Sequence, residues 1–88
     1  MLFRSVPDAG ALAIIRAGAE GIVTLDDDEI AAAIRVYWTD THNLAEGAGA
    51  APLAALLQQR ERHRGQRVGV VLCGGNIDLD LFRRWVLA

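Results

Sequence analysis

Residues 67–76 read Arg-Val-Gly-Val-Val-Leu-Cys-Gly-Gly-Asn, and this stretch decides how the rest of the chain is interpreted. The part at 67–72 is almost continuously apolar and has the length of a strand, which is typical of a strand covered on both faces in a parallel sheet. In open α/β sheets, ligands bind beyond the carboxyl ends of the strands, and Cys73 falls at that position. The stretch therefore predicts an α/β fold with a candidate binding position at Cys73.

Periodicity and turn signals predict the other elements of the fold. Helices are expected at about 9–19, 27–41, 52–62 and 79–87, with a second short strand at 21–25. The order is therefore α-β-α-α-β-α. Two strands do not make a complete sheet, and a strand that is apolar on both faces needs neighbours that this chain does not contain. We therefore expect an incomplete sheet that belongs to a larger domain.

An acidic cluster precedes the second helix. Asp26 and Glu29 have the spacing of a capping box, and negative charge stabilises a helix N-terminus, so we favour capping over the alternative of a metal site. His42 closes this helix at a surface position, without a second metal ligand at a suitable spacing. One face of the helix is predicted to pack inward, with Ile30, Ile34, Tyr37, Trp38 and Thr41.

Three further signals concern the helices that follow. Pro52 is expected in the first turn of its helix, where its missing N–H costs nothing. The basic run 60–64 is interpreted as a solvated helix end, because cations are favoured there. Asp78 is expected to cap the last helix. This helix is predicted to turn Leu79, Phe82, Trp85 and Val86 inward.

Two segments carry candidate chemistry. Residues 46–51 read Glu-Gly-Ala-Gly-Ala-Ala, a carboxylate followed by a small-residue turn, which lets backbone approach a ligand or a neighbouring element closely. Close helix packing explains this segment equally well. Cys73 is either a reactive thiol or a buried structural cysteine, and no flanking Lys or His activates it.

The composition excludes several function classes. A net charge of −2 argues against nucleic acid or an anionic membrane as the main partner. The single cysteine excludes a disulfide framework, and no apolar run approaches the roughly 20 residues of a membrane span. All nine basic residues are arginine, so chemistry that needs a lysine amine, including a Schiff base, is excluded for this chain alone.

Several motifs together resemble a known family. Glu-Gly-Ala-Gly-Ala at 46–50, Leu-Ala-Ala-Leu-Leu at 53–57 and Leu-Cys-Gly-Gly-Asn-Ile-Asp at 72–78 are similar to the closing motifs of the threonine dehydratase and serine racemase family. The likeness extends back through 27–30 to 6–8, in the right order. It implies the C-terminal part of the large domain of a tryptophan-synthase-β-like (fold type II) enzyme that depends on pyridoxal 5′-phosphate.

The resemblance also implies roles for three residues. Cys73 takes the place of a serine or cysteine that hydrogen-bonds the pyridine nitrogen of the cofactor, Gly74 lets the ring approach, and Glu46 lies near the cofactor or the pocket wall. A neutral thiol donates to an unprotonated nitrogen, whereas a carboxylate would hold the nitrogen protonated. An unprotonated ring is the weaker electron sink, which suits β-elimination of a hydroxyl. The Schiff-base lysine, the asparagine loop and the phosphate loop of the family are not in this chain, so we assign it no catalytic residue and no metal ligand.

We therefore expect part of a cytoplasmic, homo-oligomeric threonine dehydratase of isoleucine biosynthesis, which converts L-threonine into 2-oxobutanoate and ammonia. Its partners would be the N-terminal part of the same enzyme and an amino-acid substrate. Serine racemase and hydroxyaspartate dehydratase are alternatives within the family, and a free-standing small α/β binding module is the alternative outside it. Leu-Phe-Arg-Ser also translates a DNA string that resembles the end of a sequencing adapter. We therefore expect residues 1–5 to be a non-native leader and residues 6–88 to be the enzyme portion.

Overall fold

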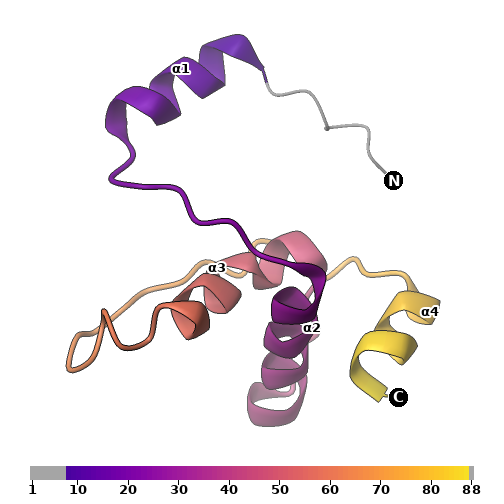
Figure 1. Cartoon of the computed structure of the whole chain (residues 1–88). Coiled ribbons are helices and arrows are strands. Elements are labelled where there is room, and N and C mark those ends of the chain that lie inside the picture. The colour runs from indigo at the N-terminus through magenta and orange to yellow at the C-terminus, as the bar shows by residue number, and fades with distance from the viewer. Residues whose placement is uncertain (1–7, 88) are drawn as a thin grey trace.

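The structure, a computed structural model, describes residues 8–87. Four α-helices lie in this range: α1 (Ala9–Gly18), α2 (Asp27–Val36), α3 (Gly47–Gln58) and α4 (Leu79–Phe82). The helices α2 and α4 each continue into a π-helical turn, at Tyr37–Thr41 and Arg83–Leu87. Figure 1 shows α2, α3 and α4 gathered together, while α1 stands apart from them. The expected leader, residues 1–5, lies outside the described residues.

The two predicted strands are not confirmed. Residues 21–26 and 66–78 have no regular secondary structure, and no strand occurs between residues 8 and 87. The physical reason is that a strand exists only through hydrogen bonds to a neighbouring strand. Both segments instead leave large apolar side chains exposed, with Ile22 at 73% and Val71 at 72%.

The first helix buries no side chain. The Asp8 carboxylate accepts a 2.9 Å hydrogen bond from the amide of Ala11 and so caps the helix. Its large apolar side chains are nevertheless unpacked, because Ile14 is 74% and Ile15 is 48% exposed. Capping therefore defines α1, and no tertiary contact buries its apolar face.

The predicted capping box of α2 is confirmed. The Asp26 side chain accepts from the amide of Glu29 at 2.7 Å, and the Glu29 carboxylate accepts from the amide of Asp26 at 3.1 Å. The carboxylates of these two residues are thus occupied by the helix terminus. At the other end, His42 follows the π-helical turn with a φ of 58°, a left-handed conformation that stops the helix.

The core forms where α2, α3 and the C-terminal turn meet. Small side chains on α2 and α3 let the two helices approach closely. The ring of Phe82 meets that of Trp38 edge to face, with centroids 5.1 Å apart. Trp38 itself stays 39% exposed, so its predicted burial is only partial. The buried apolar residues are Ala33, Ile34, Ala45, Ala50, Ala54, Phe82 and Val86.

Helix α3 begins earlier than predicted. It starts at Gly47, so Pro52 lies inside the helix and not in its first turn. Proline has no N–H, so the carbonyl of Ala48 lacks its helical donor, but Ala48 is exposed to solvent. The small residues that we interpreted as a turn are therefore the first turn of α3.

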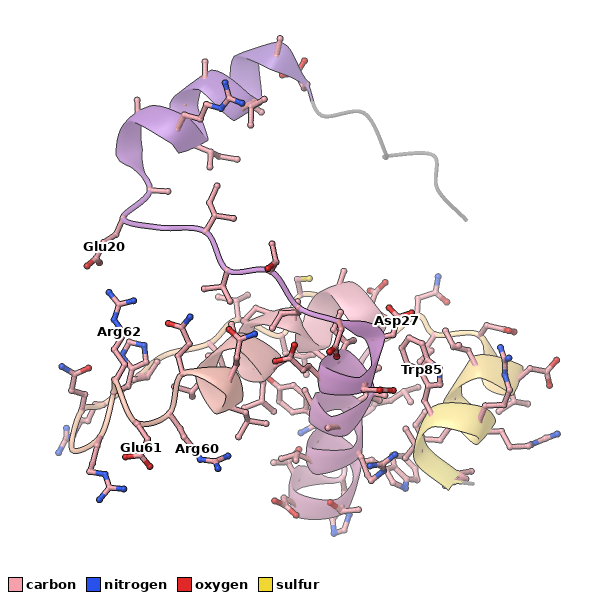
Figure 2. The ribbon with its side chains drawn as sticks, viewed as in Figure 1. Glu20, Asp27, Arg60, Glu61, Arg62 and Trp85 are labelled. Atoms are coloured by element: carbon pink, nitrogen blue, oxygen red, sulfur yellow. The ribbon has the colours of Figure 1, made fainter. Side chains whose placement is uncertain are left out.

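The chain leaves α3 at Gln58, and not at the predicted residue 62. The basic run 60–64 lies in consecutive turns after the helix. Its charges are solvated as predicted: Arg64 and Glu61 form a 2.8 Å ion pair with side chains 77% and 72% exposed. Figure 2 shows Arg60 and Glu61 reaching away from the helices.

The C-terminal segment packs against α2. Arg35 donates a 2.7 Å hydrogen bond to the backbone oxygen of Trp85, which Figure 2 shows on the side facing α2. Leu79 was predicted to face inward but is 64% exposed. Asp78 stands at the N-cap position of α4, although its carboxylate makes no capping hydrogen bond. Within residues 8–87, none of the helices is long and apolar enough to cross a membrane.

Candidate functional site

The structure brings the two candidate segments together. Residues 44–49, which lead into and begin α3, lie against residues 72–75, at the end of the apolar run. The amide of Glu46 donates a 3.1 Å hydrogen bond to the carbonyl oxygen of Gly74. Two motifs that are distant in the sequence are therefore joined through their backbones.

Glycines make this close approach possible. A Cβ at Gly49 would lie 2.5 Å from the backbone oxygen of Gly74 and 3.1 Å from the Cδ1 atom of Leu72. A Cβ at Gly75 would lie 2.6 Å from the backbone oxygen of Leu44. The two distances to backbone oxygens, 2.5 Å and 2.6 Å, are shorter than Cβ contacts in real proteins. The two segments would therefore have to separate if either glycine carried a side chain.

The carboxylate of Glu46 covers Gly74. A Cβ built on Gly74 would overlap the Oε1 atom of Glu46, so the absent side chain leaves the space that this carboxylate fills. Glu46 is half-buried and stands at the N-cap of α3, but its side chain makes no capping hydrogen bond. The partial positive charge of a helix N-terminus favours a carboxylate at this position.

Cys73 lies between Leu72 and Gly74, the two residues that face Gly49 of α3, and it is exposed as a free thiol. The alternative that we considered, a buried structural cysteine, is therefore wrong for this structure. The physical reason is that Leu72 and Gly74 make the contacts to α3, while the thiol between them is left toward solvent. Sequence analysis named Glu46, Cys73 and Gly74, and the structure places all three in one small region.

Among the described residues, no group of three His, Cys, Asp or Glu side chains could hold a metal ion. A thiol is a weak hydrogen-bond donor that could meet a pyridine nitrogen. Because the chain has no lysine, it offers no side-chain amine to an aldehyde. Of the cofactor contacts that the resemblance implies, the exposed Cys73 thiol could provide the one to the ring nitrogen, and the chain has no lysine for the one to the aldehyde.

A comparison with protein families identifies the family of the chain. Residues 3–74 match the family described as pyridoxal-phosphate dependent enzyme. The matched range includes Glu46, Cys73 and Gly74. The chain belongs to this family, which depends on pyridoxal phosphate and implies a tryptophan-synthase-β-like fold.

Individual relatives are amino-acid lyases and racemases. The chain is 42% identical over 73 residues to L-threonine ammonia-lyase of Geobacter sulfurreducens, covering 83% of this chain and 18% of that protein. It is 42% identical over 59 residues to beta-hydroxyaspartate dehydratase of Paracoccus denitrificans, covering 67% of this chain and 19% of that protein. It is 32% identical over 69 residues to serine racemase of Dictyostelium discoideum, covering 76% and 21%.

The chain spans about a fifth of the length of these relatives. The three names therefore describe proteins that are much longer than this chain. No solved structure matches the chain.

Sequence reasoning missed two residues of the site. Gly49 was noticed only as part of the small-residue segment 46–51, and Gly75 only as part of the motif at 72–78. The signal that could have found them is the pairing of two glycine-containing segments, since a close backbone contact needs a glycine at the point of approach. The pairing of Gly49 with Gly74, and of Gly75 with Leu44, depends on tertiary structure, and neither segment indicates it by itself.

Proposed function

We propose that this chain is part of a threonine dehydratase (L-threonine ammonia-lyase), which converts L-threonine into 2-oxobutanoate and ammonia. Its own contribution is the ring-nitrogen end of the cofactor site, formed by Cys73, Gly74 and Glu46. One observation carries the proposal: the hydrogen bond from the Glu46 amide to the Gly74 oxygen unites the two motifs in one place. The similarity to L-threonine ammonia-lyase supports the choice of substrate.

The residues of this chain have separate tasks in the proposed site. When bound, pyridoxal phosphate supplies an electron sink for bond cleavage at the substrate Cα. The Cys73 thiol donates a hydrogen bond to the pyridine nitrogen and does not transfer its proton. Gly74 brings no side chain to the ring, and the Glu46 carboxylate occupies the place that such a side chain would take. The Glu46 carboxylate forms one wall, held there by the N-terminus of α3 and by the Gly74 contact.

A weak neutral donor at the ring nitrogen suits the proposed reaction. Loss of a β-hydroxyl needs less electron withdrawal than reactions that hold charge on the cofactor for a long time. A carboxylate at residue 73 would keep the nitrogen protonated and so strengthen the sink. Cys73 therefore supports β-elimination as the reaction of the complete enzyme.

A second candidate is hydroxyaspartate dehydratase, because the beta-hydroxyaspartate dehydratase of Paracoccus denitrificans is also 42% identical over its matched residues. Serine racemase is a third, on the similarity to the Dictyostelium protein. Expression of the complete open reading frame at the genomic locus tests all three. We expect 2-oxobutanoate from L-threonine to form fastest. Faster ammonia release from 3-hydroxyaspartate, or racemisation of L-serine as the main reaction, would replace threonine dehydratase with the corresponding alternative.

The cofactor role of Cys73 is tested in a chimera, in which this chain replaces the matching segment of the Geobacter enzyme. We expect Cys73→Ser to retain the cofactor, because serine also donates a hydrogen bond. Cys73→Ala should weaken retention about fivefold, as for the loss of one neutral hydrogen bond of about 1 kcal/mol. Cys73→Asp should change the absorbance spectrum of the bound cofactor and slow elimination more. Unchanged spectra and rates in all three variants would show that Cys73 does not contact the ring.

A further inference from the structure

The contact between residues 44–49 and 72–75 is limited by backbone atoms at both of its ends. At one end, Gly49 faces the backbone oxygen of Gly74, and a Cβ would lie 2.5 Å from it. At the other end, Gly75 faces the backbone oxygen of Leu44, and a Cβ would lie 2.6 Å from it. Backbone oxygens cannot rotate away as the end of a side chain can. Any side chain at these two glycines must therefore push the two segments apart.

Other glycines in the same segments do not have this property. A Cβ at Gly47, in the same turn of α3, would meet only the Cγ2 atom of Ile30 at 3.8 Å, an ordinary van der Waals contact. A Cβ at Gly69, in the apolar run before Cys73, would meet no atom within 4 Å. The tight fit is thus specific to Gly49 and Gly75, and Gly47 and Gly69 are matched controls.

The two tight contacts involve the residues next to Cys73 in the chain. Gly49 faces Leu72 and Gly74, the neighbours of Cys73 on both sides, and Gly75 fixes the chain one residue further on. The Glu46 amide adds a hydrogen bond to the Gly74 oxygen within the same contact. The backbone of Cys73 is therefore fixed relative to α3 while its thiol stays exposed.

We propose that Gly49 and Gly75 are positioning residues, which set the distance between α3 and residues 72–75 and so place the Cys73 thiol at the pyridine nitrogen of the cofactor. This inference rests on the proposed function of Cys73. An alanine at Gly49 must lengthen the 2.5 Å contact to more than 3.0 Å, and an ordinary van der Waals contact of 3.4 Å requires a displacement of about 0.9 Å. Site geometry generally has to be held within about 0.5 Å, so this displacement is enough to lose the hydrogen bond.

The test uses the chimera in which this chain replaces the matching segment of the Geobacter enzyme, without bound cofactor, and four variants of this chain within it: Gly49→Ala and Gly75→Ala, with Gly47→Ala and Gly69→Ala as controls. The probe is pyridoxine 5′-phosphate, which has the cofactor ring but no aldehyde and cannot form an imine. Cys73 is the only cysteine that this chain contributes to the chimera, so peptide mapping of the labelled thiols reports on Cys73 separately. The first measurement is the protection of Cys73 by the probe. The second is the hydrogen exchange rate of the Glu46 amide without the probe.

We expect the probe to protect Cys73 in the unchanged chain and in both controls. Gly49→Ala and Gly75→Ala should need about fivefold more probe for the same protection, as for the loss of one neutral hydrogen bond. Both should also exchange the Glu46 amide faster, while the amides of α2 exchange as in the unchanged chain. The second measurement needs no cofactor, so it tests the positioning contact independently of the proposed function.

The outcomes separate the two hypotheses. If the probe fails to protect the unchanged chain, then the proposed contact of Cys73 is wrong, and with it the cofactor part of this inference. If Cys73 is protected equally in all five chains, or if the Glu46 amide exchanges equally, then the glycines do not position the segment. Equal acceleration at Glu46 and throughout α2 in both alanine variants would also overturn the inference, because it would show a general loss of structure.

Discussion

The backbone amide of Glu46 donates a 3.1 Å hydrogen bond to the oxygen of Gly74, and the carboxylate of the same glutamate lies where a side chain of residue 74 would begin. One residue thus contacts Gly74 with both its backbone and its side chain. The two contacts differ in kind, because the carboxylate ends a flexible side chain and the amide does not. Substitutions at the two positions should therefore be strongly coupled.

We expect Gly74→Ala to destabilise the chain, and we expect Glu46→Ala to remove most of that loss. Gly74 does not have a positive φ, so its backbone accepts alanine, and the overlap with Glu46 is the obstacle. Residues in direct contact typically show interaction energies of about 0.5–3 kcal/mol in a double-mutant cycle. Urea unfolding of the two single variants and the double variant measures this energy.

Gly69→Ala serves as the control for the cycle, because a Cβ at residue 69 meets no atom within 4 Å. Combined with Glu46→Ala it should give additive losses. If the Gly74→Ala and Glu46→Ala losses also add without coupling, then the carboxylate does not lie against Gly74 in solution.

The capping box of α2 gives a second prediction. We expect Asp26→Ala to lower the free energy of unfolding by about 1 kcal/mol, since it removes the acceptor for the Glu29 amide. Asp28→Ala, within the first turn but outside the capping box, should cost less. Thermal unfolding followed by circular dichroism compares the two variants. Equal losses would mean that the charge of the first turn matters and the capping hydrogen bonds do not.

These two sites show which features can be predicted from sequence. The start of α2 was predicted correctly because Asp26 and Glu29 are three residues apart and the capping box is a local structure. The inward face of α4 was predicted less well. Leu79 follows the apolar pattern, but α4 is four residues long before the π-helical turn, and this residue is left exposed.

The site and the sheet depend on contacts between distant residues. Only the resemblance to a family placed Glu46 and Cys73 in one site, because nothing local to either segment indicates the other. Gly49 and Gly75 were missed for the same reason. The strand pattern at 67–72 predicts burial on both faces. Val68 and Val71 are nevertheless 41% and 72% exposed, because residues 8–87 contain no strand to pair with the segment.

The absence of lysine gives a third prediction. We expect the isolated chain, mixed with pyridoxal phosphate and reduced with borohydride, to carry an adduct only at its N-terminal amine, because it has no lysine amine. Peptide mapping by mass spectrometry locates the adduct, and a chain acetylated at its N-terminus is the control that should carry none. The isolated chain should also form no 2-oxobutanoate from L-threonine. A reduced adduct at any internal residue, or measurable turnover, would contradict this expectation.

The last prediction concerns association of the isolated chain. Ile14, Ile22 and Val71 are 74%, 73% and 72% exposed, so three segments of the chain present large apolar side chains to water. The backbone of residues 66–72 has no strand partner, and unpaired backbone of this kind is a template for pairing with another chain. We therefore expect self-association that increases with concentration, together with binding of a hydrophobic dye.

Sedimentation velocity over a range of concentrations measures the association. Ile22→Gln and Val71→Gln should each weaken it, whereas Arg64→Gln, a change in the solvated turn after α3, should leave it unchanged. A chain that stays monomeric at all concentrations and binds no dye would favour the free-standing small module. Such a module has no large apolar surface that another part of an enzyme would have to cover.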